Sequence, residues 1–188
     1  MAGSSQSWQQ TLITAQSDGA AITAAAATSM LPAQAKFTLP AQFLQTVGQQ
    51  LMIKAHGRVS TVITTPGTLR VDVRFGSTVV FDGQAVALIT ANAYTNIPWV
   101  VEILLTVRAV GTSANMMGYG TLQAMNVQGG TTSAAPQGSA IAQLPWNQAP
   151  AVGNNFDSTS SQVVDFFFTQ TVATGSWTLH QFSLIAMN

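Results

Sequence analysis

The chain has 188 residues, which fits one large domain, and 47% of them are hydrophobic. Only 6% are charged, far below the roughly 25% of an average soluble domain, and six Lys/Arg balance six Asp/Glu. The basic residues form no cluster, so the chain is not expected to bind nucleic acid, because phosphate contacts need grouped Lys and Arg.

No apolar run is long enough for a membrane-spanning helix, and the first residues do not form a secretory signal. The absence of cysteine excludes disulfides and thiolate metal sites, and it fits synthesis in a reducing cytoplasm. So few charges would protect a free monomer poorly against association. The composition therefore favours a protein that is packed into an assembly.

Residues 1–30 are expected to form an extended N-terminal segment with a flexible start over 1–7, ahead of a single β domain over 31–188. Residues 8–15 predict a short strand. The Ala/Thr-rich stretch 20–29 favours an extended chain, with a helix as the alternative. Residues 40–47 are the best helix candidate, because Pro40 is tolerated in a first turn and Gly48 can end the helix.

Alternation of apolar and polar residues predicts the remaining strands. They are expected near residues 36–39, 50–65, 69–75, 78–81, 84–90, 97–110, 118–127, 162–171 and 177–188. Pro66-Gly67 and Asp82-Gly83 are turn signals. Residues 128–161 predict a long loop with one short strand near 141–144, anchored by Trp146 and Phe156. A shift of the apolar phase at His180-Gln181 predicts a β-bulge.

The stretch 97–110 predicts a central strand with two different faces. One face is apolar: Trp99, Val101, Ile103, Leu105, Val107 and Ala109. The other mixes apolar and polar groups: Val100, Glu102, Leu104, Thr106, Arg108 and Val110. Many short strands and almost no helix predict an all-β protein, an antiparallel β-sandwich of jelly-roll type with at most one short helix.

The residues show no catalytic or metal-binding constellation, so we expect no enzyme, cofactor or metal. The only histidines, His56 and His180, are expected to be structural. The candidate carboxylates for general acid–base catalysis are Asp72, Asp82, Glu102 and Asp165. For Asp72 and Glu102 the simpler expectation is an ion pair with a residue on a neighbouring strand. Asp82 is explained by its position before Gly83 in a turn.

The segments 31–40, 57–60, 65–76 and 97–110 together resemble small structural proteins of tailed-phage virions. The resemblance implies a jelly-roll-like domain, often trimeric, which sits on the capsid surface as a decoration or cement protein. The implied partners are two further copies of the chain and the major capsid protein. We expect the subunit or capsid interface to include Val100, Leu104, Arg108, Trp146 and Phe167.

Two other readings remain open. A receptor- or carbohydrate-binding head domain of a fibre or spike would use exposed aromatic residues such as Trp146 or Tyr94. The other hypothesis, the coat protein of a small jelly-roll virus, has less support. Such coats usually carry a basic arm that holds nucleic acid, and no Lys or Arg precedes Lys36 here.

Overall fold

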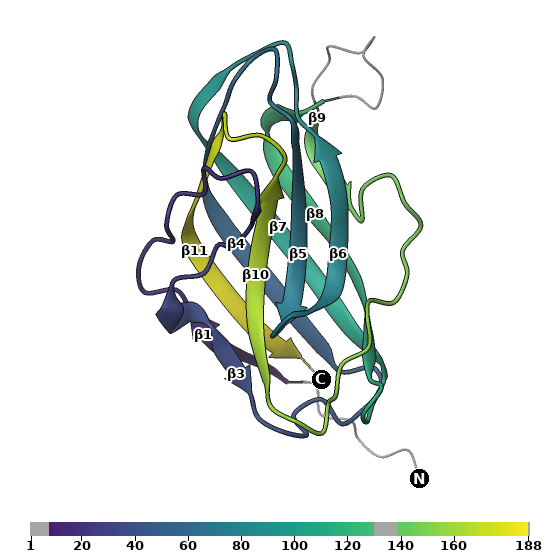
Figure 1. The fold of residues 1–188 in the computed structure, drawn as a ribbon. Coiled ribbons are helices and arrows are strands. Elements are labelled where there is room, and N and C mark those ends of the chain that lie inside the picture. Colours follow the sequence, from purple (N-terminus) through teal and green to yellow (C-terminus); the bar gives the residue numbers. More distant parts are fainter. Residues whose placement is uncertain (1–7, 130–138, 188) are drawn as a thin grey trace.

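The computed structural model describes residues 8–129 and 139–187, which form two antiparallel sheets packed face to face (Figure 1). The six-stranded sheet has the order β1 (Gln9–Thr14), β11 (Ser176–Met187), β4 (Gln50–Thr61), β7 (Tyr94–Ala109), β8 (Asn115–Gln128) and β9 (Ser139–Leu144). The five-stranded sheet contains β2 (Ala27–Ser29), β10 (Gln162–Gln170), β5 (Thr68–Phe75) and β6 (Thr78–Ala87), and β3 (Phe37–Leu39) also pairs with β10. The predicted all-β sandwich is confirmed.

The strands pair in a nested order. β1 pairs with β11 and β4 with β7 in one sheet, while β2 pairs with β10 and β5 with β6 in the other. This is the pairing of a jelly roll, in which one long antiparallel ribbon is wound into two facing sheets. β8 and β9 extend the six-stranded sheet on the far side of β7. The predicted jelly-roll type is therefore confirmed, with one added hairpin.

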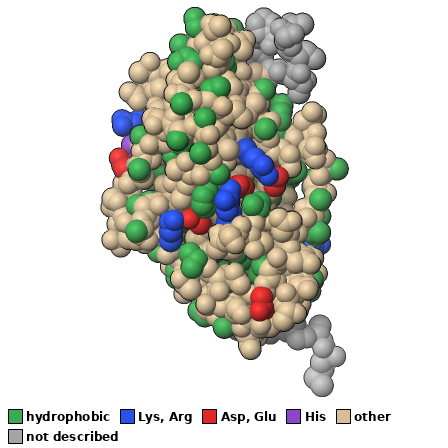
Figure 2. All heavy atoms as spheres, in the orientation of Figure 1, with side chains coloured by type: hydrophobic (Ala, Val, Ile, Leu, Met, Phe, Trp, Pro, Cys, Tyr) green, Lys and Arg blue, Asp and Glu red, His purple; other side chains and the backbone are tan. Residues whose placement is uncertain are grey.

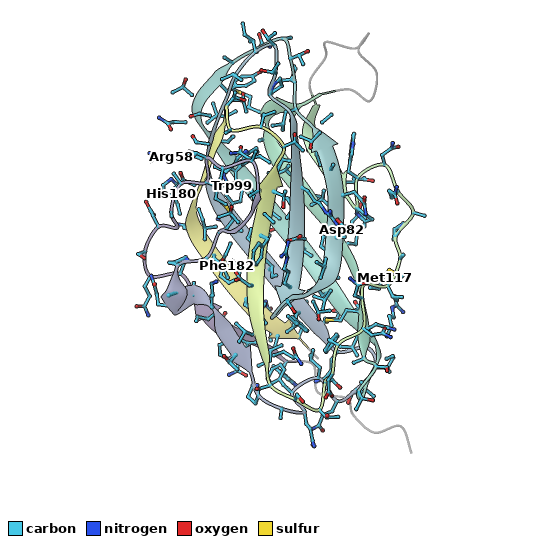
Figure 3. All side chains as sticks on the ribbon, viewed as in Figure 1. Arg58, Asp82, Trp99, Met117, His180 and Phe182 are labelled. Atoms are coloured by element: carbon cyan, nitrogen blue, oxygen red, sulfur yellow. The ribbon has the colours of Figure 1, made fainter. Side chains whose placement is uncertain are left out.

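Strand β7 lies between β4 and β8, and its two faces differ as the alternation predicts. Trp99, Val101, Ile103, Leu105 and Val107 are at most 1% exposed. Trp99 meets Phe168 of the opposite sheet at a ring distance of 5.1 Å, and Phe168 packs edge-on against Trp177 at 5.4 Å. Trp99 and Phe182, labelled in Figure 3, belong to this aromatic layer between the sheets.

The aromatic layer depends on a close approach at Gly57. A Cβ atom there would lie 2.6 Å from the Trp99 ring and 1.9 Å from the Thr178 carbonyl oxygen, so no larger residue fits without a shift. On the neighbouring strand, the register with β4 shifts between Leu179 and Gln181. The β-bulge expected at His180-Gln181 is confirmed, and it keeps both halves of β11 facing the core.

The helix predicted over residues 40–47 is wrong. The described chain forms turns and bends there, and its one helical element is a short 3-10 turn, η1 (Ala33–Ala35). Gln42 adopts a left-handed φ of 60°, and the Gln49 side chain accepts hydrogen bonds from the backbone of Gln45 and Thr46. These local bonds replace a helical ladder. Gly48 does adopt the positive φ expected of a residue that ends a helix. Its backbone N–H donates a hydrogen bond to the carbonyl oxygen of Val107 in β7.

The turn predicted at Asp82-Gly83 is also wrong, because β6 runs through it without reversing. Asp72 lies opposite Asp82 and Arg70 opposite Ala85, so β6 carries an extra residue there. The Asp82 carboxylate accepts hydrogen bonds from the backbone and side chain of Gln84, which has a φ of 61°. The dipeptide therefore forms a bulge in place of a hairpin turn.

The N-terminal segment is extended, as expected for residues 20–29, and it is part of the sandwich. It supplies β1 and β2, and Ile22 and Met30 are at most 2% exposed. The flexible start expected over 1–7 lies outside the described residues. No helix in the described part of the chain is long and apolar enough to cross a membrane.

The stretch 128–161 contains more structure than the predicted loop. β8 extends to Gln128, and the short strand expected near 141–144 is β9; residues 130–138 lie outside the described chain. The rest runs back along the sandwich through isolated bridges at Val152 and Phe156. Phe156 is buried against Phe75, so the expected anchoring by this residue is confirmed.

Candidate binding surfaces

The outer face of the five-stranded sheet carries six of the twelve charged residues of the chain. They are Lys36, Arg70, Asp72, Arg74, Asp82 and Asp165. Figure 2 shows positive and negative side chains gathered over this face. They form three neutralising pairs: Lys36 with Asp165, Arg70 with Asp82, and Arg74 with Asp72. We call this set the ion-pair layer.

The geometry of the ion-pair layer is tight. Lys36 Nζ lies 2.6 Å from Asp165 Oδ2, and Arg74 Nη2 lies 2.9 Å from Asp72 Oδ2. Arg70 donates to both carboxylate oxygens of Asp82 in a bidentate pair, a strong form of hydrogen bond. The Arg74 guanidinium also lies 3.9 Å above the Phe167 ring, a cation–π contact. The layer is neutral as a whole and presents no free carboxylate for acid–base work.

Two groups of this layer, Asp72 and Arg70, have a raised pKa. Asp72 is only 2% exposed, and burial raises its pKa above the ordinary value although Arg74 and Arg70 act in the opposite direction. The hydrogen bond to Asp82 raises the pKa of Arg70, so the guanidinium stays ionised. The cross-strand ion pair expected for Asp72 is wrong: Asp72 does form an ion pair, but its partner Arg74 lies two residues along the same strand, β5.

A cleft lies beside the ion-pair layer, between β6 and the segment 145–154. Its volume is about 290 Å³. Arg70, Asp82 and Gln84 line it from the five-stranded sheet, and Gln148 and Asn154 line it from the segment. The apolar part of its wall includes Val79, Phe81, Pro145 and Val152.

Asp82 and Met117, labelled in Figure 3, lie on the side of the sandwich along which this segment runs.

The outer face of the six-stranded sheet is less charged and more apolar. Four side chains are in register across β11, β4, β7 and β8. This apolar row is Ile185, Met52, Leu104 and Tyr119. Tyr119 is 47% exposed, and Met125 and Ile141 on the same face are 58% and 52% exposed. A shallow depression of about 160 Å³ opens between Met52, Leu104 and Tyr119.

Polar pairs flank the apolar row. The next row across the strands is Lys54, Glu102, Thr121 and Gln143. Lys54 Nζ lies 3.4 Å from Glu102 Oε1, with both side chains about half exposed. The cross-strand pairing expected for Glu102 is confirmed, and such an exposed pair contributes little stability.

The residues expected at an interface do not share one surface. Val100, Leu104 and Arg108 lie on the outer face of β7 in the six-stranded sheet. Phe167 lies on the outer face of the opposite sheet, under Arg74. Trp146 follows β9, packs half-buried against the core and donates its backbone N–H to Gly83. The structure thus brings together the β7 residues and separates Phe167 and Trp146 from them.

Neither aromatic residue considered for sugar binding lines the cleft. Tyr94 lies half-buried at the start of β7, opposite Thr61, and Trp146 packs against the core as described. The histidines have ordinary partners: His56 Nδ1 is 3.2 Å from Gln181 Oε1, and His180 Nδ1 is 2.9 Å from Asp18. Within residues 8–129 and 139–187, no three His, Cys, Asp or Glu side chains are grouped to hold a metal.

Sequence reasoning missed two features of these surfaces. Tyr119 and Met52 complete the apolar row, and the alternation of β8 could have placed Tyr119 on the same side as Met117 and Met125. The cleft had no such signal, because its walls come from β6 and from a segment more than 60 residues later. Only the wrapping of that segment along β6 brings them together.

No protein-family model matches the chain, and no curated protein matches it either. What the structure establishes is an architecture: the chain is a two-sheet antiparallel β-sandwich with the strand pairing of a jelly roll.

Proposed function

We propose that the chain is a structural virion protein, a decoration protein that assembles as a homotrimer on the outside of a tailed-phage head. The trimer, the capsid partner and the location follow from the resemblance described for segments 31–40, 57–60, 65–76 and 97–110. The observation that carries an assembly role is the apolar row on the six-stranded sheet.

The apolar row has the form of a contact surface. Strands lie about 4.8 Å apart, so four aligned side chains extend over roughly 14 Å. Tyr119 is exposed, Met52 and Leu104 are partly exposed, and Ile185 at the far end of the row is buried. Apolar side chains exposed side by side mark interaction sites. The depression beside Leu104 has about the volume of a cavity that can hold a benzene ring, so one side chain of a neighbour can enter it.

The distribution of charge supports the same proposal. Half of the charges are neutralised within the ion-pair layer on the opposite sheet. The apolar row is left with one exposed Lys–Glu pair beside it. In a cyclic trimer one surface meets a different surface of the next subunit, so the apolar row needs a complementary patch and not a copy of itself.

The test is the oligomeric state in solution. Leu104→Glu places a charge in the centre of the apolar row and is expected to convert a trimer into monomers, because an unpaired charge in an interface is costly. Light scattering after size exclusion measures the mass. Val163→Glu is the matched control, since Val163 is a partly exposed aliphatic residue on the outer face of the five-stranded sheet.

A wild-type monomer at high concentration would refute the trimer. A trimer that survives Leu104→Glu would refute the apolar row as its interface.

Location is tested separately, by electron microscopy of intact particles labelled with an antibody to this chain. Label on the head surface is expected, and label confined to a tail or fibre would overturn the decoration role.

A further inference from the structure

We propose that the cleft between β6 and the segment 145–154 binds a small neutral saccharide. This activity is additional to an assembly role, because the cleft lies beside the five-stranded sheet and away from the apolar row. Its polar and apolar walls match the two faces of a sugar ring.

The charge of the cleft favours a neutral ligand. Its two charged groups, Arg70 and Asp82, neutralise each other in a bidentate pair. The oxygens of Asp82 are also occupied by the Gln84 backbone N–H and side-chain amide, each at 2.9 Å. An anion would have to displace Asp82 from Arg70, and a cation would have to displace four donated hydrogen bonds.

The free polar groups in the cleft suit hydroxyls. Gln148 and Asn154 are exposed, and their side-chain amides have no hydrogen bond in the described part of the chain. An amide offers both donors and an acceptor, and a hydroxyl does the same, so each amide can bind one or two sugar hydroxyls. Val79, which is partly exposed, and Val152, which is 47% exposed, offer an apolar wall to the C–H face of the ring.

The cleft is held in shape before any ligand binds. Trp146 donates its backbone N–H to Gly83 at 2.8 Å, and Asn154 donates to Val79 at 3.2 Å, so both ends of the segment are fixed to β6. Gly153 donates to Met116 of β8 at 2.9 Å. A site that is already ordered loses less conformational entropy when a small ligand binds.

The same bonds argue against a peptide. β6 is the last strand of its sheet, and an extended peptide would normally bind such an edge through backbone hydrogen bonds. The carbonyls of Val79, Gly83 and Ala87 already accept from Asn154, Trp146 and Gly129. The cleft volume of about 290 Å³ is at the lower end of the roughly 300–1,000 Å³ of small-molecule sites, which fits one or two sugar rings.

The experiment uses the full chain and a panel of neutral and anionic glycans on an array, followed by saturation-transfer NMR titration of the best neutral saccharide. We expect saturable binding to at least one neutral saccharide. Gln148→Ala and Asn154→Ala should each weaken it about 3- to 10-fold, the effect of one lost hydrogen bond. Ala151→Trp should abolish binding, because Ala151 lines the cleft and is exposed.

Gln16→Ala is the matched control, because Gln16 is an exposed loop glutamine outside the cleft, and it should leave the affinity unchanged. No binding to any neutral saccharide would overturn the proposal, and so would binding confined to anionic glycans. Binding that both amide variants and Ala151→Trp leave unchanged would place the sugar elsewhere and also overturn it. Leu104→Glu should bind the saccharide like the wild type, so the two proposals can fail independently.

Discussion

Single residues on the outer face of the five-stranded sheet show how a chain with few charges uses them. Asp72 is directly opposite Asp82, and two adjacent carboxylates would repel each other without cations beside them. Arg70 and Arg74 supply those cations from β5 itself. Asp72 is nevertheless almost completely buried, and the loss of hydration outweighs the two arginines in setting its pKa.

The raised pKa of Asp72 predicts a pH dependence of stability. The folded protein holds this proton more tightly than the unfolded chain, whose Asp pKa is about 3.9. Ionisation therefore costs more in the folded state, and the contribution of Asp72 to stability decreases as the pH rises through these two pKa values. The unfolding free energy of the wild type minus that of Asp72→Asn is expected to fall as the pH rises past the unfolded pKa of about 3.9 and through the higher folded pKa.

Asp157→Asn is a control of opposite sign for the urea titrations that measure this difference. Hydrogen bonds from the Thr159 hydroxyl and backbone, and from Ser160, lower the pKa of Asp157. A lowered pKa stabilises the folded state above the unfolded pKa, and this stability is lost as the pH falls. The corresponding difference should therefore rise with pH. A rising difference for Asp72→Asn would show that the arginines dominate at that site.

At the scale of elements, β11 shows how one extra residue keeps a strand in the core. Trp177 and Leu179 point inward in the first half of β11, and Phe182 and Leu184 point inward in the second. Side chains alternate strictly along a regular strand, so these two sets could not share a face without the bulge. His180 has no partner in the register between β11 and β4, so it is the extra residue.

Deleting His180 is therefore expected to leave a folded protein. The deletion gives β11 a single alternating phase, and every inward residue keeps its place opposite β4. Deleting Ser183 instead should turn Phe182 or Leu184 outward and unfold the protein, because burying either side chain contributes about 1.5–3 kcal/mol. Circular dichroism with urea unfolding compares the two variants. A cooperative, equally stable Ser183 deletion would show that this strand does not depend on its phase.

At the scale of the whole molecule, the two sheets have different outer faces. One face holds the ion-pair layer and the adjacent cleft, and the other holds the apolar row. A jelly roll buries only the inner faces of its two sheets, so both outer faces are open to other uses. In the proposed assembly the apolar row meets a neighbouring subunit and the cleft stays accessible.

A trimer predicts that thermal stability depends on concentration. Mass action favours the associated folded state, and for a trimer of this size the midpoint should rise by about 2–3 °C for each tenfold increase in protein concentration. Differential scanning fluorimetry or calorimetry over a hundredfold range measures it. The midpoint of Leu104→Glu should not move with concentration. A constant midpoint for the wild type, at concentrations that span dissociation, would count against assembly through the apolar row.

Much of this architecture could be predicted from local alternation. The two faces of β7, the phase shift in β11 and the positive φ of Gly67 in its turn all depend on neighbouring residues along the chain. Where the prediction was wrong, distant or side-chain contacts competed with local preference. Gln49 closed the turns over residues 40–48, and Arg70 and Gln84 held Asp82 inside a continuous strand.

Alternation of apolar and polar residues was sufficient to assign an all-β sandwich, because burial of one face is a property that each strand carries in its own sequence. The tertiary structure alone decided which outward residues meet. The apolar row combines β11, β4, β7 and β8, and the cleft combines β6 with a segment more than 60 residues later. Such contacts depend on strand order and register, which are set by long-range packing and leave no periodic signal in a single sequence.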